Sequence, residues 1–195
     1  MSELFTGLIS IALVNHLVLT QLLGLEAWFA GPAGLRRSAL FGLSAALLMI
    51  GSTLISNAFL GLTSMIVGSQ VRSGFALPVV MVVSALLLMP LRLILMRFAP
   101  VELPVLKRSF PLLALNSAVI GTGLLATWHV SGVADLIGFA IANAVAFVVF
   151  LLVFAAIQQR VNTNDVPAPF RGTPILLISA GIMSLAILAF EGVVP

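Results

Sequence analysis

The sequence predicts an all-α polytopic membrane protein, and three observations support this fold class. Of the 195 residues, 61% are hydrophobic and 8% are charged, and the mean hydropathy is +1.24. Soluble globular chains carry about 25% charged residues, so this chain has too few charges for a solvated surface all round. Its apolar runs are continuous, which favours transmembrane helices over the alternating strands of a barrel.

Six apolar runs separated by polar breaks give six predicted transmembrane helices. A helix needs about 20 residues to cross the hydrocarbon layer, and the length of the chain allows this number. The first run has no basic residue before it and is interpreted as a retained span, not a cleaved signal peptide. Residues 1–195 are predicted to form one transmembrane domain without a soluble part. The predicted spans cover about residues 5–25, 38–60, 75–96, 111–128, 136–157 and 173–190, with the longest polar segment at residues 158–172.

The distribution of basic residues predicts the orientation of the chain. Eight of the nine lie in the first, third and fifth loops or at the end of the third span, whereas the second loop holds Arg72 alone. Short loops rich in Lys and Arg remain on the cytoplasmic side, so both termini are predicted to lie outside. The basic residues form no clustered patch, so the net charge of +3 does not indicate nucleic-acid binding.

Weak internal similarity suggests two repeats of three spans each. The sequence around Asn15 aligns with that around Asn116 at an offset of 101, and a second match shares Leu, Gly and Ala at an offset of 96. The repeats would cover about residues 5–98 and 110–191. An odd number of spans in each unit inverts the second relative to the first. Many transporters have this plan, with the working site near the bilayer midplane.

Polar residues and glycines occupy equivalent positions of the first and fourth spans. Polar groups at membrane depth are costly and usually face a cavity, a partner helix or each other. Glycines weaken the helix and permit unwound or closely packed backbone. For any single residue, a hydrogen bond between helices is the alternative interpretation. The residues predicted to form an ion or electron path are Asn15, Gly24, Asn116 and Gly121.

The chain contains no cysteine. Disulfides, thiolate metal ligation and thiol catalysis are therefore excluded for this polypeptide alone. No HExxH, P-loop, GxSxG or dinucleotide-binding motif occurs, so no catalytic residue and no metal site is predicted.

Three segments carry a resemblance to a known family. They are DVPAPFRG at residues 165–172, ALVNHLVLTQLLGL in the first span and FPLLALNSAVIGTGLL in the fourth. The chain resembles the A-type subunits of the Rnf electron-transport complex, which are themselves similar to the E-type subunits of the Na⁺-translocating NADH:quinone reductase. The resemblance runs from about residue 5 to residue 190. It implies six helices in two inverted repeats, in the bacterial inner membrane, with both termini on the periplasmic side.

The resemblance also implies a function. The chain would be a membrane subunit of a complex that passes electrons between ferredoxin or NADH and an acceptor and moves Na⁺ or H⁺. Its partners would be other membrane subunits, above all an inverted homologous one. The family shares a [2Fe–2S] cluster between these two subunits, and its cysteine positions are here Glu26 and Ser117. Clusters are held mainly by thiolates, so neither residue is expected to support a normal cluster.

Two alternatives from other classes stay open on the sequence. One is a stand-alone small transporter or channel with inverted repeats and no redox role. The other is a cofactor-free scaffold subunit that holds cofactor-bearing partners. The absence of cysteine favours these two, whereas the specific loop at residues 165–172 favours the electron-transport subunit.

Overall fold

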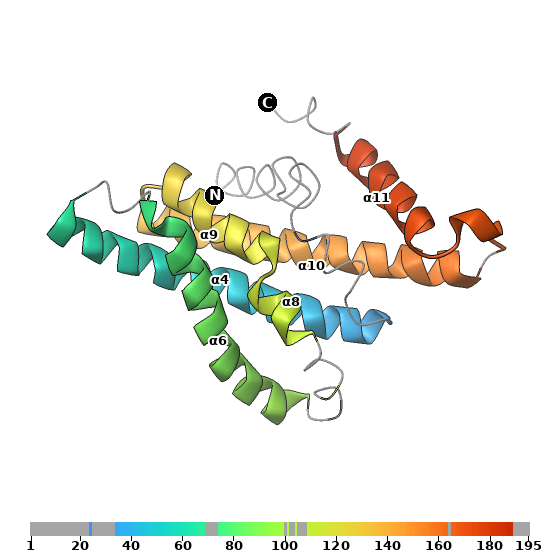
Figure 1. Cartoon of the computed structure of the whole chain (residues 1–195), viewed down its shortest axis with the longest axis horizontal. Helices are drawn as coiled ribbons and strands as arrows, with labels where there is room; N and C mark the ends of the chain where they lie inside the picture. Colours follow the sequence, from blue (N-terminus) through green and yellow to red (C-terminus); the bar gives the residue numbers. More distant parts are fainter. Residues whose placement is uncertain are drawn as a thin grey trace.

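The computed structural model describes residues 24, 34–68, 74–99, 101, 104, 109–163 and 165–188 (Figure 1). Within these ranges the chain is helical apart from turns and short links, and no strand occurs, which confirms the all-α prediction. The elements in order are α4 (Leu35–Val67), α6 (Ala76–Phe98), α8 (Phe110–Ala114), α9 (Ser117–His129), α10 (Val133–Thr163), the 3₁₀ turn η2 (Ala168–Phe170) and α11 (Thr173–Leu188).

Several of the described helices are suited to a bilayer by length and composition. Leu35–Ile66, Ala76–Phe98, Phe110–His129 and Val133–Val161 are long and apolar enough to cross, and Thr173–Ala186 is a shorter apolar helix. A helical membrane protein with four or five such helices is therefore confirmed. The first predicted span lies outside the described residues except for Gly24. The count of six and the inverted repeats stay predictions.

Two predicted spans are shorter than the helices that contain them. α4 has 33 residues and α10 has 31. At 1.5 Å per residue these helices are about 50 and 46 Å long, more than the roughly 30 Å of hydrocarbon. The predicted ranges 38–60 and 136–157 followed the apolar run, but both helices continue into polar residues. Residues 158–163, predicted as loop, belong to α10.

The antiparallel pair of α4 and α10 lies at the centre of the described helices (Figure 1). Near one end, a Cβ added to Gly42 of α4 would lie 3.0 Å from Cδ2 of Leu151 on α10. Towards the other end, Leu54 and Ile137 line one pocket. The small residue permits close approach of the two backbones, as expected for membrane helices. The core contains fully buried aromatic and aliphatic side chains, including Phe41, Phe147, Phe154 and Leu48.

The remaining helices are arranged around this pair. α6 and α9 both contact α4, and they also contact each other. α11 contacts α10 and η2 and lies apart from α4 and α6 in Figure 1. α6 is the most exposed of the four long helices, because 22% of its most apolar stretch is buried against 56% for α4 and α10. Its exposed apolar side chains, which suit contact with lipid or with an apolar partner surface, include Leu77, Val82, Leu86, Met89, Leu93 and Phe98.

Candidate functional site

The fourth predicted span is interrupted between α8 and α9. The sequence left open whether this span is continuous; it is broken at Leu115 and Asn116, and Asn116 has φ −61° and ψ 119°, outside the helical region. Asn116 is the N-cap of α9, and its Oδ1 accepts a hydrogen bond of 2.8 Å from the backbone N–H of Ala118. Asparagine is among the best N-cap residues because its side chain satisfies a free N–H of the first turn. The buried break therefore depends on the side chain of Asn116.

Helix α6 satisfies a carbonyl that the break leaves free. In a continuous helix the carbonyl of Ala114 would accept the N–H of Ala118, four residues on. Ser84 replaces that donor, because its Oγ lies 2.9 Å from the Ala114 carbonyl oxygen and also 2.9 Å from that of Met81. An unsatisfied carbonyl in lipid costs several kcal/mol, so Ser84 stabilises the break. Sequence reasoning missed Ser84; its signal was a lone hydroxyl in the apolar run VVSALLL.

A hydrogen bond joins the first and fourth predicted spans at this break. The backbone N–H of Gly24 donates to Oγ of Ser117 at 2.6 Å, across 93 residues of sequence. Gly24 has φ +83°, in the left-handed region that favours glycine. A Cβ added there would lie 2.9 Å from Cβ of Ala118 and 2.9 Å from the ring of Phe147. Glycine is therefore required twice, once for the backbone conformation and once for space.

We call the contact of Gly24 with Asn116, Ser117 and Ala118 the junction. It brings together three of the residues that the sequence singled out. Gly121 lies on α9 four residues beyond Ser117 and is partly buried. Asn15 and Glu26 lie outside the described residues, so their places in the path or at a cofactor stay predictions.

The described side chains of the junction are neutral, and all are buried except that of Ser117, which is partly buried. Asn116 is 0% exposed, and its Nδ2 has no hydrogen-bond partner. Two further buried polar atoms have no hydrogen-bond partner. They are Oγ1 of Thr53 on α4 and Oδ1 of Asn143 on α10. A junction of this composition offers a carboxamide, a hydroxyl and a helix N-terminus to whatever binds or passes there. In the described part of the chain, no group of three His, Cys, Asp or Glu residues could hold a metal ion.

The [2Fe–2S] cluster that the resemblance implies does not fit the described junction. The cluster needs thiolates, and the chain has no cysteine. The hydroxyl at position 117 already accepts the Gly24 N–H, and beside Gly24 there is no room even for a methyl group. The junction has neither the ligands nor, next to Gly24, the space for iron and sulfide.

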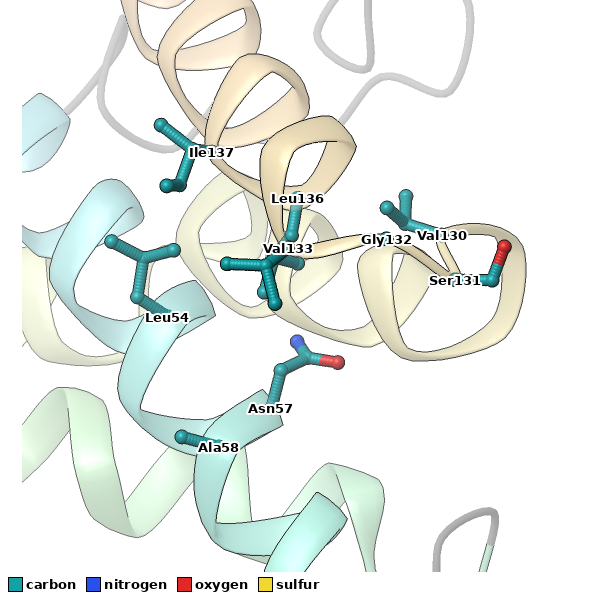
Figure 2. Close-up of a pocket in the computed structure, with 9 residues that line it drawn as sticks. All are labelled: Leu54, Asn57, Ala58, Val130, Ser131, Gly132, Val133, Leu136 and Ile137. Carbon is teal, nitrogen blue, oxygen red and sulfur yellow. The ribbon is translucent and has the colours of Figure 1, made fainter.

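A separate pocket of about 340 Å³ lies where α4 passes the link between α9 and α10 (Figure 2). Figure 2 shows the carboxamide of Asn57 directed into the gap between α4 and α10, whereas the hydroxyl of Ser131 points away from it. The Nδ2 of Asn57 donates to the Thr53 carbonyl of its own helix at 3.0 Å. Sequence reasoning did not predict this pocket, which is lined by Leu54, Asn57, Ala58, Val130, Ser131, Gly132, Val133, Leu136 and Ile137.

These features together define a class of protein. Long apolar helices with apolar outer faces, and one span broken at a buried polar junction, describe a polytopic helical membrane protein. Broken membrane helices of this kind commonly mark the working site of transport proteins. Residues 4–194 match the family model described as "Rnf-Nqr subunit, membrane protein". The chain belongs to this family.

Curated relatives match the chain over its whole length. A protein of Pseudoalteromonas atlantica is 32% identical, with 100% of this chain and 99% of the relative covered. A protein of Syntrophotalea carbinolica is also 32% identical, and one of Cereibacter sphaeroides is 30% identical, both with 100% of each chain covered. Each of these relatives is named as the A-type subunit of an "ion-translocating oxidoreductase complex". The resemblance found in the sequence is confirmed.

Proposed function

We propose that this chain is the A-type membrane subunit of an Rnf/Nqr-type complex, which couples electron transfer between ferredoxin or NADH and an acceptor to Na⁺ or H⁺ movement. The observation that carries the proposal is the full-length similarity to relatives named as the A-type subunit of an ion-translocating oxidoreductase complex. Nothing in the sequence suggests catalysis by this chain on its own, so its redox role belongs to the assembly.

The junction supports a role in the working part of that complex. It brings a turn at Gly24 against the broken fourth span, and Asn116 there has an unpartnered Nδ2 and no exposed surface. Buried polar groups without a partner are costly in membranes, and they mark ion or substrate pathways. We assign the path to the neighbourhood of Gly24, Asn116 and Gly121, with Asn15 expected beside them.

We further propose two inverted repeats, residues 5–98 and 110–191. Two observations support this arrangement. α4 and α10 would be the second helix of each repeat, and they are the two longest described helices, with 33 and 31 residues. They also run antiparallel, as inversion of one repeat relative to the other requires.

The proposed topology places both termini on the periplasmic side of the inner membrane. The link between α9 and α10 would then face outward, and the link between α10 and α11 would face the cytoplasm. These links lie at opposite ends of α10, a helix of 31 residues. A chain without cysteine allows a direct test, because single cysteines can be introduced and labelled in intact cells.

Two exposed positions form a matched pair for that test. Ser131→Cys is expected to react with a membrane-impermeant maleimide in cells whose outer membrane alone is permeabilised. Ala168→Cys is expected to react only after the inner membrane is opened; both positions are exposed. The reverse pattern would overturn the proposed orientation.

The proposed partners are the other membrane subunits of the complex, above all an inverted homologous one. A tagged full-length chain, isolated from native membranes in mild detergent, should bring down flavin-bearing and iron–sulfur-bearing subunits identified by mass spectrometry. Isolation of the chain alone, with a stand-alone ion flux in proteoliposomes, would favour the transporter alternative and contradict the proposal.

A cofactor-free scaffold subunit is the second candidate, and the absence of any cysteine favours it. Ion uptake by membrane vesicles energised with the electron donor separates the two roles. If the junction is part of the path, Asn116→Ala should lower ion uptake per electron in complexes that still assemble. A pure scaffold predicts an unchanged ratio in the assembled complex.

A further inference from the structure

We infer that Ser117 is a structural hydrogen-bond acceptor and not a cluster ligand. The resemblance implies a cysteine of the family at this position, whereas here the Ser117 side chain closes the junction by accepting a hydrogen bond from a backbone N–H. The inference rests on the proposed function only in that the expectation of a cluster comes from the family. Everything else in it comes from the geometry of the described residues.

The hydroxyl of Ser117 accepts a hydrogen bond from a backbone amide of a distant segment of the chain. Its Oγ lies 2.6 Å from the Gly24 nitrogen, a short and direct hydrogen bond from a backbone N–H. Gly24 is a turn residue with φ +83°, and its N–H points to a side chain 93 residues further along the chain. A free N–H at a buried position in a membrane protein is costly. The hydroxyl of Ser117 removes that cost.

The space beside Gly24, the donor of this hydrogen bond, is filled by apolar groups. Ala118, which follows Ser117, is 0% exposed, and Phe147 of α10 is also 0% exposed. Both lie 2.9 Å from the position that a Cβ on Gly24 would take, closer than real Cβ contacts come. Iron and sulfide placed beside Gly24 would have to displace these groups. The packing around the hydrogen bond is that of a closed contact.

The chemistry of a serine side chain also disfavours iron ligation. Iron–sulfur clusters are held by thiolates, with imidazole as the known replacement in Rieske centres. A serine hydroxyl is protonated and neutral near pH 7, and here it accepts a hydrogen bond from Gly24. Its lone pairs suit a backbone N–H and do not suit iron. The break keeps its geometry without a metal, because Asn116 caps α9 and Ser84 bonds the Ala114 carbonyl.

A structural role for Ser117 has a consequence for the whole assembly. Any [2Fe–2S] centre in the complex would be ligated without Ser117. Substitution of Ser117 should therefore change the stability of this chain and leave the iron content and spectrum of the complex unchanged. A cluster ligand would behave in the opposite way.

The test uses the complex isolated through a tag on the full-length chain, in four forms. These are the wild type, Ser117→Ala, Ser117→Thr and the control Ser179→Ala. Ser179 is a partly buried hydroxyl that bonds the Ile175 carbonyl of its own helix at 2.9 Å, so its loss breaks no contact between segments. Three quantities are measured: iron for each copy of the chain, the low-temperature EPR spectrum, and the thermal unfolding midpoint of this chain.

The expected result is the same iron content and the same EPR spectrum in all four forms. The unfolding midpoint should fall by several degrees in Ser117→Ala alone and be kept in Ser117→Thr, which retains a hydroxyl. Loss of iron, or a changed [2Fe–2S] signal, in Ser117→Ala would overturn the inference. An unchanged midpoint in that variant would also overturn it.

Two further controls keep the inference testable. If Ser117→Ala does not accumulate, Ser117→Cys takes its place, and a midpoint at or above the wild-type value would overturn the inference because a thiol is the weaker acceptor. If no partner subunits are isolated, the proposed function fails by that result. The full-length chain alone then still reports iron content and unfolding midpoint for the inference itself.

Discussion

The continuous helix α10 and the broken span α8–α9 satisfy their backbone hydrogen-bonding groups in different ways. α10 satisfies its backbone groups internally over 31 residues, and its buried residues Phe147 and Phe154 pack in the core. The broken span lacks the helical bond between the Ala114 carbonyl and the Ala118 N–H. The side chain of its own cap accepts from the Ala118 N–H, and Ser84 of α6 donates to the Ala114 carbonyl. The comparison teaches that a buried break is stabilised by a few specific polar contacts, whereas a continuous helix is stabilised by many interchangeable apolar ones.

The largest effect is expected for Gly24→Ala, because the substitution meets both strain and crowding. Gly24 and Gly34 both have positive φ, +83° and +101°, which alanine rarely adopts, so the backbone strain costs about 1–3 kcal/mol at either position. Crowding differs, because a Cβ on Gly24 would meet Ala118 and Phe147 at 2.9 Å while one on Gly34 meets nothing within 4 Å. Overpacking adds about 1–3 kcal/mol at Gly24 alone.

Unfolding of the two variants in detergent, followed by circular dichroism, measures this difference. Gly24→Ala should be destabilised by about 2–6 kcal/mol, which combines the strain and overpacking ranges, and Gly34→Ala by the strain range alone. Equal destabilisation of both would show that the close contact at the junction does not exist.

The next largest effect is expected for Asn116→Ala, which removes the cap of α9. Loss of an N-cap costs about 0.5–2 kcal/mol, and the buried N–H of Ala118 is left without a partner. Asn143→Ala is the matched control on the continuous helix, because Nδ2 of Asn143 bonds the Phe139 carbonyl of its own helix. Denaturant titration should show the larger loss for Asn116→Ala. A larger loss of stability for Asn143→Ala would contradict the claim that the break depends more on single polar contacts than the continuous helix does.

A smaller effect is expected for Ser84→Ala, which leaves the Ala114 carbonyl without its donor. The cost is about 0.5–1.5 kcal/mol, the net value of one hydrogen bond, because the single hydroxyl hydrogen of Ser84 is shared between the Ala114 and Met81 carbonyls. Ser44→Ala is the control, because Oγ of Ser44 bonds the Leu40 carbonyl within the continuous α4. The unfolding midpoint should fall for Ser84→Ala and stay close to wild type for Ser44→Ala. Equal unfolding midpoints for the two variants would contradict the claim that α6 stabilises the break through Ser84.

The fold class could be predicted from the sequence because hydropathy and charge report directly on the solvent of the exterior. The ends of α4 and α10 could not, since a helix continues past the apolar run wherever its backbone bonds are maintained. The proximity of Gly24, Asn116 and Ser117 was suggested by polar residues and glycines at matching places in two spans. Their hydrogen bond was not predictable, because it depends on a positive φ at Gly24 and a cap at Asn116.

The role of Ser84 was also beyond the sequence. A serine in a membrane helix usually bonds a carbonyl of its own preceding turn, and Ser84 does so with Met81. The same hydroxyl hydrogen is shared with the Ala114 carbonyl of another helix, and this contact exists only because the fourth span is broken opposite Ser84. A pairwise contact of this kind depends on tertiary packing and not on local pattern.

The most direct test of the central claim is the hydrogen exchange rate of the Gly24 amide, followed by mass spectrometry on the purified full-length chain. If the junction is closed by the bond to Ser117, this amide is protected in the wild type. Ser117→Ala should speed its exchange about two- to tenfold, which corresponds to a net hydrogen bond of about 0.5–1.5 kcal/mol, and Ser179→Ala should leave it unchanged. A Gly24 amide that exchanges at the same rate in the wild type and in Ser117→Ala would contradict the account.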